Sequence, residues 1–302
     1  MTRAPQVRLL ADGRRLHLQD GPIDLIIEAR GAETHIRAAY DAAARHFDGL
    51  LDELCGELAR LREPADPAGC RLRGRVARRM HDAVVPFAAD HFITPMAAVA
   101  GAVAEEILGA MLDTTRLDRA YVNNGGDIAL HLADREHFTV GLADRPDAPG
   151  SMRTMTIHAG DPMRGVATSG WRGRSFSLGI ADAVTVLART ASRADAAATI
   201  IANAVDLPEH PAIVRRPAHD LQPDSDLGAR LVTRGVGELL GGEIAYALES
   251  GAAAARRLLA EGLIDGAALR LQGEMTVVAA KALEIPISRV SCGSPAESAM
   301  HA

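Results

Sequence analysis

Short runs of alternating apolar and polar residues open the chain. Leu16–Gln19 and Ile23–Ile27 flank an Asp-Gly-Pro turn, and this combination is typical of β-strands. From residue 32 to residue 62 the apolar positions recur instead at every third or fourth residue, which gives the segment one apolar face. The pattern therefore predicts strands at the beginning of the chain and a long amphipathic helix over 32–62.

Helical and strand patterns are mixed in the rest of the chain. A short helix that ends near Pro86 is expected within 75–91. Another is expected to begin after Thr94-Pro95, because Thr commonly caps a helix and Pro fits its first turn. Further helices are predicted at 195–205 and 243–260. The predicted strands are Tyr121–Leu132, His137–Ala143, Met152–His158, Gly165–Ala167, Thr185–Ala188, Leu231–Thr233 and Ala267–Leu271.

The order of these elements favours one fold class. Groups of strands and groups of helices follow one another without a regular β-α alternation, which favours an α+β fold over a doubly wound sheet. The 302 residues suffice for one large domain or two smaller ones, and we treat 1–302 as a single domain. Its segment 206–230 is rich in Pro and Asp and is predicted to be a long loop, either a functional lid or a solvated connector.

Composition and charge exclude several classes of protein. Hydrophobic residues make up 48% of the chain and charged residues 24%, so the chain as a whole is not intrinsically disordered. Its 33 basic and 39 acidic residues give a net charge of −6, and aromatic residues make up only 3%. Without a basic excess, and with few rings to stack on bases, the chain is not expected to bind nucleic acid.

The cysteines and the apolar runs indicate the compartment. Cys55, Cys70 and Cys292 form no CxxC pair, and their odd number argues against a disulfide framework and for a reducing environment. The N-terminus lacks the apolar core of a signal peptide, and the longest apolar run, Pro95–Ala104, is too short to span a bilayer. We therefore expect a cytoplasmic protein that does not associate with a membrane.

The strongest local signal for a ligand is Asn123-Asn124-Gly125-Gly126-Asp127. Glycines let a backbone approach a ligand closely, exposed amides beside them can hold an anion, and the polar side chains supply donors and acceptors. The same residues also suit a tight β-hairpin, in which Asn-Gly is a common turn. The sequence alone leaves both interpretations open.

A second candidate segment, Gly165–Ser177, holds glycines and small hydroxyl residues together with two arginines. Hydroxyls can donate to phosphate oxygens, guanidinium groups can pair with them, and the only tryptophan of the chain can stack on a ring. The residues suited to these contacts are Thr168, Ser169, Gly170, Trp171, Arg172, Arg174 and Ser175. A Gly/Ser loop with a half-buried Trp is the alternative, but the density of phosphate-compatible groups favours ligand binding. Neither GxGxxG nor Gx4GK[ST] is present.

A third candidate is the pair Asp195 and Thr199, which are four residues apart in a predicted helix and therefore share one of its faces. A carboxylate and a hydroxyl beside a phosphate suit Mg²⁺, which takes one or two carboxylates and completes its shell with phosphate and water. An Asp in the first turn of a helix is also ordinary capping chemistry, which is the simpler interpretation of the spacing alone.

Two further acidic segments are candidates for supporting roles. Asp182 is suited to act as a second cation contact or a general base, or to be a simple turn residue. The acidic turn 223–228 is suited to reach a metal, or to be a solvated loop or helix cap. The histidines form no HExxH pattern and no GxSxG is present, so neither a zinc site nor a serine nucleophile is supported.

Taken together and in this order, the three candidate segments resemble the ApbE-type flavin transferase superfamily, and more closely an uncharacterised bacterial and archaeal family of ApbE-like proteins. The resemblance runs from about Tyr40 to Val205. It is carried by Asn124–Ile128 for the "GGD" strand, Ala167–Gly170 for the "ATSG" segment and Ala194–Thr199 for the "AD..AT" helix start.

The resemblance implies an α+β fold of the T-fold type and a Mg²⁺-assisted reaction in which FAD donates FMN, through its phosphate, to a Ser or Thr of a target protein. It implies that Asp195, Thr199 and the main chain of Ala167 and Ala198 contact the metal, and that the "GGD" and "TSG" segments line the pocket for the flavin nucleotide. The expected ligands are Mg²⁺ and FAD or FMN. An acceptor protein and a homo-oligomer are left open.

The chain departs from the superfamily at two positions. The transferases carry a His-containing segment with a Pro-Arg-Thr-Gly turn after the "TSG" segment, whereas Ser177–Asp182 contains no His. They also carry Lys-Gly where this chain has Ala100-Gly101. Three hypotheses follow. The chain is a Mg²⁺-dependent enzyme acting on a flavin nucleotide, with Asp182 or Asp127 as the base; or a flavin-binding carrier without catalysis; or an enzyme acting on a pterin, purine or pyridine derivative.

Overall fold

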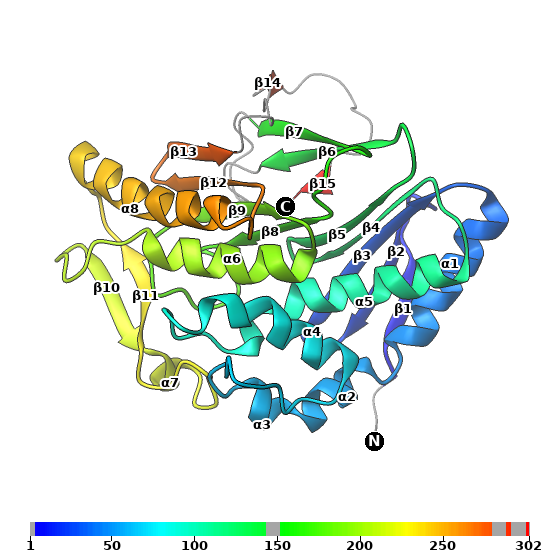
Figure 1. Ribbon diagram of the computed structural model, residues 1–302, viewed down its shortest axis with the longest axis horizontal. Coiled ribbons are helices and arrows are strands. Elements are labelled where there is room, and N and C mark those ends of the chain that lie inside the picture. The colour runs from blue at the N-terminus through cyan, green and yellow to red at the C-terminus, as the bar shows by residue number, and fades with distance from the viewer. Residues whose placement is uncertain (1–3, 143–151, 280–287, 291–299, 302) are drawn as a thin grey trace.

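A nine-stranded antiparallel sheet runs through the centre of the molecule (Figure 1). The computed structural model describes residues 4–142, 152–279, 288–290 and 300–301. In the order in which they pair, the strands are β1 (Gln6–Leu9), β2 (Leu16–Asp20), β3 (Ile23–Arg30), β4 (Arg119–Asn124), β5 (Asp127–Leu132), β8 (Gly165–Ser169), β9 (Ala183–Ala188), β12 (Gly266–Leu271) and β13 (Glu274–Ala279). Segments that are distant in the sequence therefore become neighbours in one sheet.

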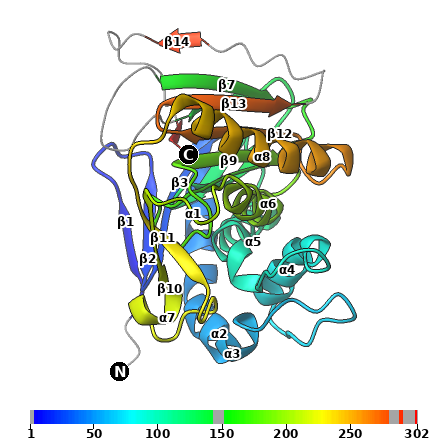
Figure 2. The ribbon, with the colours of Figure 1, turned by 90° about the vertical axis from the view of Figure 1, so that its left-hand side faces the viewer.

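Helices cover one face of this sheet, and a second sheet covers the other. The second sheet consists, in pairing order, of β14 (Ser288–Val290), β7 (Met152–His158), β6 (His137–Leu142) and β15 (Met300–His301). The helices are α1 (Glu33–Phe47), α2 (Leu50–Gly56), α3 (Leu58–Leu61), α4 (Arg75–Val84), α5 (Val99–Thr114), α6 (Ala191–Ala204) and α8 (Gly241–Ala260), with the short 3₁₀ helices η1 (Val85–Phe87) and η2 (Pro95–Ala98). In Figure 1, β6 and β7 lie above the central sheet and α4, α5 and α6 below it, and Figure 2 shows these helices on one side of β1–β3.

Alternation along the strands explains these layers. On β4 and β5, Val122 and Ala129 belong to the core shared with the helices, whereas Tyr121 belongs to the core beneath the second sheet. Because successive side chains of a strand point to opposite faces, Asn124 and Asp127 fall on the helical side. The nine-stranded antiparallel sheet with its packed helices confirms the predicted α+β class.

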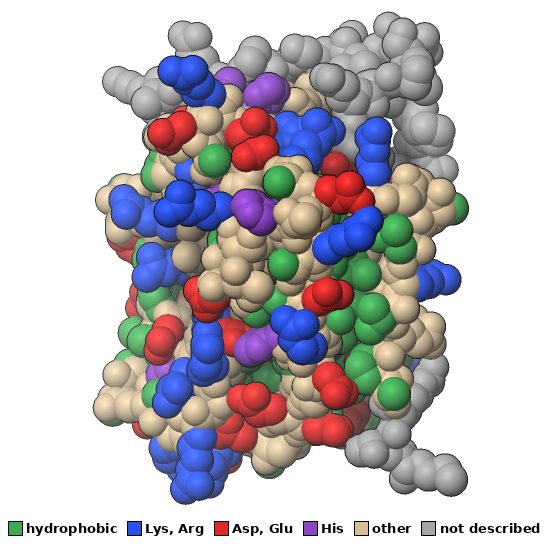
Figure 3. Space-filling model, turned by 90° about the vertical axis from the view of Figure 1, so that its right-hand side faces the viewer, with side chains coloured by type: hydrophobic (Ala, Val, Ile, Leu, Met, Phe, Trp, Pro, Cys, Tyr) green, Lys and Arg blue, Asp and Glu red, His purple; other side chains and the backbone are tan. Residues whose placement is uncertain are grey.

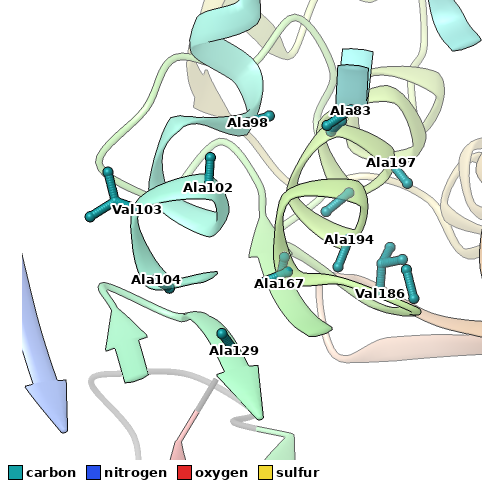
Figure 4. Packing of buried hydrophobic residues seen from close by; sticks show 14 of the residues in the cluster. Ala83, Ala98, Ala102, Val103, Ala104, Ala129, Ala167, Val186, Ala194 and Ala197 are labelled. Carbon is teal, nitrogen blue, oxygen red and sulfur yellow. The ribbon is translucent and has the colours of Figure 1, made fainter. Parts of the chain in front are cut away.

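Small side chains allow α5 and α6 to lie close to each other and to the sheet (Figure 4). Ala104 of α5 lies over Ala129 of β5, and Ala194 of α6 lies near Ala167 of β8. Where the two helices meet, a Cβ on Gly101 would lie 2.4 Å from the carbonyl oxygen of the first residue of α6, so only glycine fits there. This contact brings the first turns of the two helices together.

Two predicted helices begin or end differently in the structure. The helix expected over 32–62 is divided into three helices, and Gly49, which adopts a φ of +80°, makes the first break, between α1 and α2. The helix expected from Asp195 begins four residues earlier at Ala191, with Thr190 as its N-cap. Residues of low helix propensity at these boundaries decide both differences.

The segment 206–230 is not a long loop as predicted. It contains β10 (Ile213–Pro217) and α7 (Ala218–Leu221), and β10 pairs with β11 (Leu231–Val236) in a separate two-stranded ribbon. No side chain of β10 is fully buried, so the strand lacks the clear apolar alternation by which strands are recognised.

One helical segment of the described residues, Pro95–Thr114, has the length and mean hydropathy, 1.4, of a membrane span. This segment is longer than the apolar run Pro95–Ala104 seen in the sequence, because the helix continues through Glu105 and Glu106. The carboxylate of Glu105 accepts from the N–H of Ser192, and that of Glu106 pairs with Arg79. Within this fold, α5 packs against α1, α6 and the central sheet, and more than half of the most apolar part of the segment is buried. Its apolar residues therefore belong to the core.

Candidate functional site

The Asn-Gly-Gly-Asp segment is the turn of the hairpin between β4 and β5. Asn124 pairs with Asp127, and the two glycines between them have φ values of +67° and +111°. The N–H of Gly126 donates to Oδ1 of Asn123 at 2.8 Å, which closes the turn. The hairpin interpretation is therefore confirmed for the backbone.

The hairpin is tied to the first turn of α5. The side chain of Asn124 is 5% exposed, and its Nδ2 donates to the carbonyl oxygen of Ala100 at 3.1 Å. On the other side of that turn, Oδ2 of Asp195 accepts from the N–H of Gly101 at 3.0 Å, and the carboxylate also accepts from the N–H of Ala100. The turn thus joins β4 to α6.

Asp195 does not cap its own helix. It is the fifth residue of α6, whose N-cap is Thr190 with its hydroxyl accepting from the N–H of Arg193. Instead, the carboxylate lies at the N-terminus of α5, where free backbone N–H groups and the helix dipole favour a negative charge. Asp195 is therefore not the cap of α6, as the sequence suggested, but its carboxylate caps the N-terminus of α5.

A second carboxylate, that of Asp127, interacts electrostatically with that of Asp195. Burial raises the pKa of Asp127 to about 7, and the N–H of Thr168, 3.3 Å from Oδ1, and the charge of Arg174 act in the opposite direction. Burial also raises the pKa of Asp195, and repulsion by Asp127 raises it further. Two neighbouring carboxylates that both resist ionisation form a place where a positive charge is favoured.

Arg174 lies over the hairpin turn. A Cβ added to Gly125 would be 2.0 Å from Nη2 of Arg174, so the guanidinium rests directly on the glycine. Arg174 is otherwise exposed, and its positive charge acts to lower the pKa of Asp127. A glycine is needed at this position both for its positive φ and for the contact with the arginine.

The loop that leads to Arg174 is held by Asp182. Its Oδ1 accepts from Nε1 of Trp171 at 3.2 Å and from Nε of Arg172 at 2.7 Å, and its Oδ2 accepts from the N–H of Gln272 at 2.6 Å. The guanidinium of Arg172 also lies 4.6 Å from the centre of the Trp171 ring. Both carboxylate oxygens of Asp182 thus accept hydrogen bonds, so Asp182 fixes the loop in place. It is not the free general base that was one interpretation of the sequence.

The remaining predicted residues are placed as follows. The hydroxyl of Thr168 meets that of Thr185 at 2.9 Å, so Thr168 offers the site its main-chain N–H and not its side chain. The half-buried or exposed residues are Ser169, Ser175 and Thr199, and the buried ones are Gly170, Ala167 and Ala198. The acidic turn 223–228 is directed elsewhere: Asp226 accepts from Thr94, and Asp224 pairs with Arg62.

The main-chain amides of Ala100 and Gly101 were missed as site groups by the sequence interpretation. The sequence showed only that Lys-Gly is absent there, although the Thr94-Pro95 start placed a helix N-terminus nearby. Glu105 was missed as well: its Oε1 accepts from the N–H of Ser192 at 2.6 Å, so α5 supplies a carboxylate to the first turn of α6. Each helix therefore receives a carboxylate from the other, and these contacts fix the position of Asp195.

An ionic cluster around the buried carboxylate of Glu106 lies one turn further along α5. Glu106 is 2% exposed and accepts from Nη1 of Arg79 and Nε2 of His46, both at 2.7 Å. Burial tends to raise the pKa of Glu106, but the hydrogen bonds from Arg79 and His46 outweigh it and lower the pKa. The cluster opens into a hollow of about 350 Å³ beside Arg45 and Arg75. Figure 3 shows the side of the molecule where α1 lies, with basic, acidic and histidine side chains interspersed.

The donor set at the hairpin fits a hard cation better than a transition metal. Among the residues that the structure describes, no group of three or more His, Cys, Asp and Glu side chains is arranged to hold a metal. Two carboxylates are nevertheless sufficient for Mg²⁺ when phosphate and water complete its shell. Asp127 and Asp195 offer two such carboxylates.

Comparison with known proteins identifies the family. A family model described as AbpE bacteria matches residues 7–277. The chain belongs to this family. The match covers the β4–β5 hairpin, the loop 168–176 with Trp171, and α6. It extends on both sides of Tyr40–Val205, the part in which the motifs carry the resemblance.

Curated archaeal relatives carry the name UPF0280 protein. The chain is 42% identical over 142 residues to that of Methanopyrus kandleri, which covers 47% of this chain and 54% of the relative. It is 41% identical over 114 residues to that of Methanothrix thermoacetophila, which covers 37% and 46%. The chain thus spans about half the length of these relatives. The family match and these relatives confirm the predicted resemblance to an uncharacterised ApbE-like family.

A solved structure of similar extent is the apo form of the flavinyl transferase ApbE from Pseudomonas stutzeri. It matches with a TM-score of 0.48 at 13% sequence identity, over 93% of this chain and 97% of that chain.

Proposed function

We propose that this protein binds a flavin nucleotide, FAD or FMN, together with Mg²⁺ in the region where the β4–β5 hairpin, the loop 168–176 and α6 meet. The observation that carries the proposal is the pair of carboxylates on Asp127 and Asp195. Their raised pKa values mean that the ionised pair is costly without a cation. A divalent ion bound between a phosphate and these oxygens would remove that cost.

The groups around the pair suit a phosphate. The hairpin turn is exposed at Gly125, and the guanidinium of Arg174 lies over it. Thr199 is one helical turn beyond Asp195 on the same side of α6. In the proposed complex Thr199 and the carbonyl oxygens of Ala167 and Ala198 complete the metal contacts, as the family resemblance implies.

The choice of a flavin rests on the resemblance to ApbE-type transferases, a group to which the flavinyl transferase ApbE of Pseudomonas stutzeri belongs by name. Trp171, half-buried at the start of the loop, supplies an aromatic ring for the heterocycle. A pterin, purine or pyridine nucleotide offers similar chemistry, and competition against FMN distinguishes these ligands.

A transfer reaction would need one more group. Transfer of FMN from FAD to a Ser or Thr hydroxyl of an acceptor protein releases AMP, and the hydroxyl proton needs an acceptor. Bound Mg²⁺ would supply neutralisation of the phosphate charge. Asp127 is the carboxylate proposed to take the proton, through an oxygen that does not bind the cation, since Asp182 is engaged with three donors.

Binding without transfer is the second candidate. It is favoured by one observation: Ser177–Asp182, where the transferases have their His, contains no histidine, and its carboxylate serves to hold a loop. In either case we expect a cytoplasmic protein, and the exposed free thiols of Cys55 and Cys70 agree with a reducing environment.

Calorimetric titration with FAD and FMN, each with and without Mg²⁺, tests the proposal. We expect binding that Mg²⁺ strengthens, and loss of this strengthening in Asp195→Asn. The matched control is Asp265→Asn, which makes the same chemical change in front of β12 and should titrate like the wild type. Absence of heat with either flavin in both conditions would refute the proposal. Intact mass after incubation with FAD and a Ser/Thr peptide separates transfer from binding.

A further inference from the structure

The loop between β8 and β9 returns to the carboxylate from which it starts. The N–H of Thr168, near the end of β8, donates to Asp127, and the charge of Arg174, six residues later, acts on the same carboxylate. Trp171 lies midway between them. Three residues span at most about 10 Å, so the backbone of Trp171 stays within about that distance of both anchors and therefore close to the proposed phosphate and metal groups.

The loop backbone is pressed onto the segment that precedes β9. A Cβ on Gly170 would lie 2.5 Å from the carbonyl oxygen of Asp182, and the N–H of Trp171 donates to the carbonyl oxygen of Ala181 at 3.0 Å. The N–H of Gly173 closes the next turn on the carbonyl oxygen of Gly170 at 3.1 Å. These contacts fix the main chain on either side of the tryptophan.

The indole itself is fixed by Asp182. The bond from Nε1 sets the plane of the ring, and Arg172, which donates to the same carboxylate oxygen, has its guanidinium 4.6 Å from the ring centre. Part of the ring remains accessible, because Trp171 is only half-buried. An aromatic ring that is already held in one orientation costs little entropy when a planar ligand stacks on it.

Asp182 is in turn anchored to the β12–β13 hairpin. Its N–H donates to the carbonyl oxygen of Arg270 at 2.9 Å, and its Oδ2 accepts from the N–H of Gln272. Gln272 has a φ of +45°, and its side chain bonds to Gly237 and Leu239 at 2.6 and 3.2 Å. A residue other than glycine keeps a left-handed backbone conformation only where the surrounding contacts fix it. The carboxylate therefore sits on a rigid support and not on a free loop.

We propose that Asp182 is a positioning residue that holds Trp171 as a stacking platform for the planar heterocycle of the bound nucleotide. Asp182 thereby makes the site select ring-bearing phosphate compounds over ring-free ones. This inference rests on the proposed function, because the ring in question is that of the nucleotide whose phosphate binds beside Asp127 and Asp195.

The test compares two ligands in the presence of Mg²⁺: FMN, which has a ring, and inorganic pyrophosphate, which has none. In Asp182→Asn we expect the affinity for FMN to fall by about 10-fold, the effect of releasing one or two ordered side chains. The affinity for pyrophosphate should stay within about 2-fold, because the phosphate groups are untouched. Asp265→Asn, at the opposite end of β12, serves as the control and should leave both affinities unchanged.

The single tryptophan gives an independent measurement. Emission of the wild type reports Trp171 alone, so FMN should quench it, and acrylamide should quench the free Asp182→Asn variant more strongly than the free wild type. If Asp182→Asn does not fold, Trp171→Ala replaces it, with the same selective loss for FMN expected. Equal losses for FMN and pyrophosphate, or no loss for either, would overturn the inference. A wild type that binds neither ligand would instead refute the proposed function.

Discussion

Asp127→Asn gives the sharpest test of the electrostatics at the site. The amide keeps an oxygen that can accept from the N–H of Thr168, but it removes the charge beside Asp195. The pKa of Asp127 rises from 3.8 to about 7 on folding, chiefly through burial. At about 1.4 kcal/mol for each pH unit, an ionised Asp127 at pH 8 costs the metal-free protein on the order of 4 kcal/mol.

The sign of the pH dependence follows from the protons bound. Between pH 3.8 and pH 7 the folded protein holds a proton that the unfolded chain has released, so stability falls as the pH rises through this range. From pH 5 to pH 8 the wild type should lose about 3 kcal/mol through this group, and Asp127→Asn should not. The variant is therefore expected to gain stability over the wild type by about 3 kcal/mol more at pH 8 than at pH 5.

Urea unfolding at these two pH values, with EDTA present, measures the difference. Asp41→Asn, on the exposed side of α1, is the control and should show the same pH dependence as the wild type. The reasoning is refuted if Asp127→Asn follows the pH dependence of Asp41→Asn. With Mg²⁺ and FMN added, the wild type should recover its loss at pH 8, since the cation removes the repulsion, while the variant should gain little.

Three more substitutions test other parts of the account. Gly101→Ala places a Cβ 2.4 Å from the backbone of α6 and should lower stability by more than about 2 kcal/mol in thermal unfolding, whereas Gly109→Ala on the same helix, with open space around it, should raise it by up to about 1 kcal/mol. Gly125→Ala displaces Arg174 and strains the turn, so calorimetry should show a roughly 10-fold weaker affinity for FMN. Glu106→Gln removes the charge that accepts from Arg79 and His46, which are only partly buried, and should cost about 2 kcal/mol at pH 7. Because the pKa of Glu106 is lowered, its stabilisation disappears as the pH falls through that pKa, and urea unfolding at pH 3 should show a smaller cost.

Most of the elements were predictable because their periodicity is strong. The α+β class, the strands around β4–β9 and the helices α5 and α8 follow from apolar patterns that match their burial. The breaks were less predictable. Gly49 divides a continuous apolar face by a local turn, and β10 has no fully buried side chain to mark it as a strand. The T-fold type stays a prediction.

The individual segments of the site were predictable from the sequence, but the contacts that connect them were not. Motifs placed Asp127, Asp195 and the tryptophan loop near one another only through a family resemblance, because no local rule brings β5, β8 and α6 together. The backbone groups of Ala100 and Gly101 carry no side-chain signal, so sequence patterns could not show that they bind Asp195. The role of Asp182 depends on Gln272, which is 90 residues away.

The central claim is that Asp127 and Asp195 share one divalent cation beside a nucleotide phosphate. Anomalous scattering from crystals grown with Mn²⁺ and FMN tests it most directly. We predict a single manganese peak within about 2.2 Å of a carboxylate oxygen of each aspartate, with a phosphate oxygen in the same shell. A bound nucleotide with no peak there, or a peak that contacts neither carboxylate, would contradict the claim.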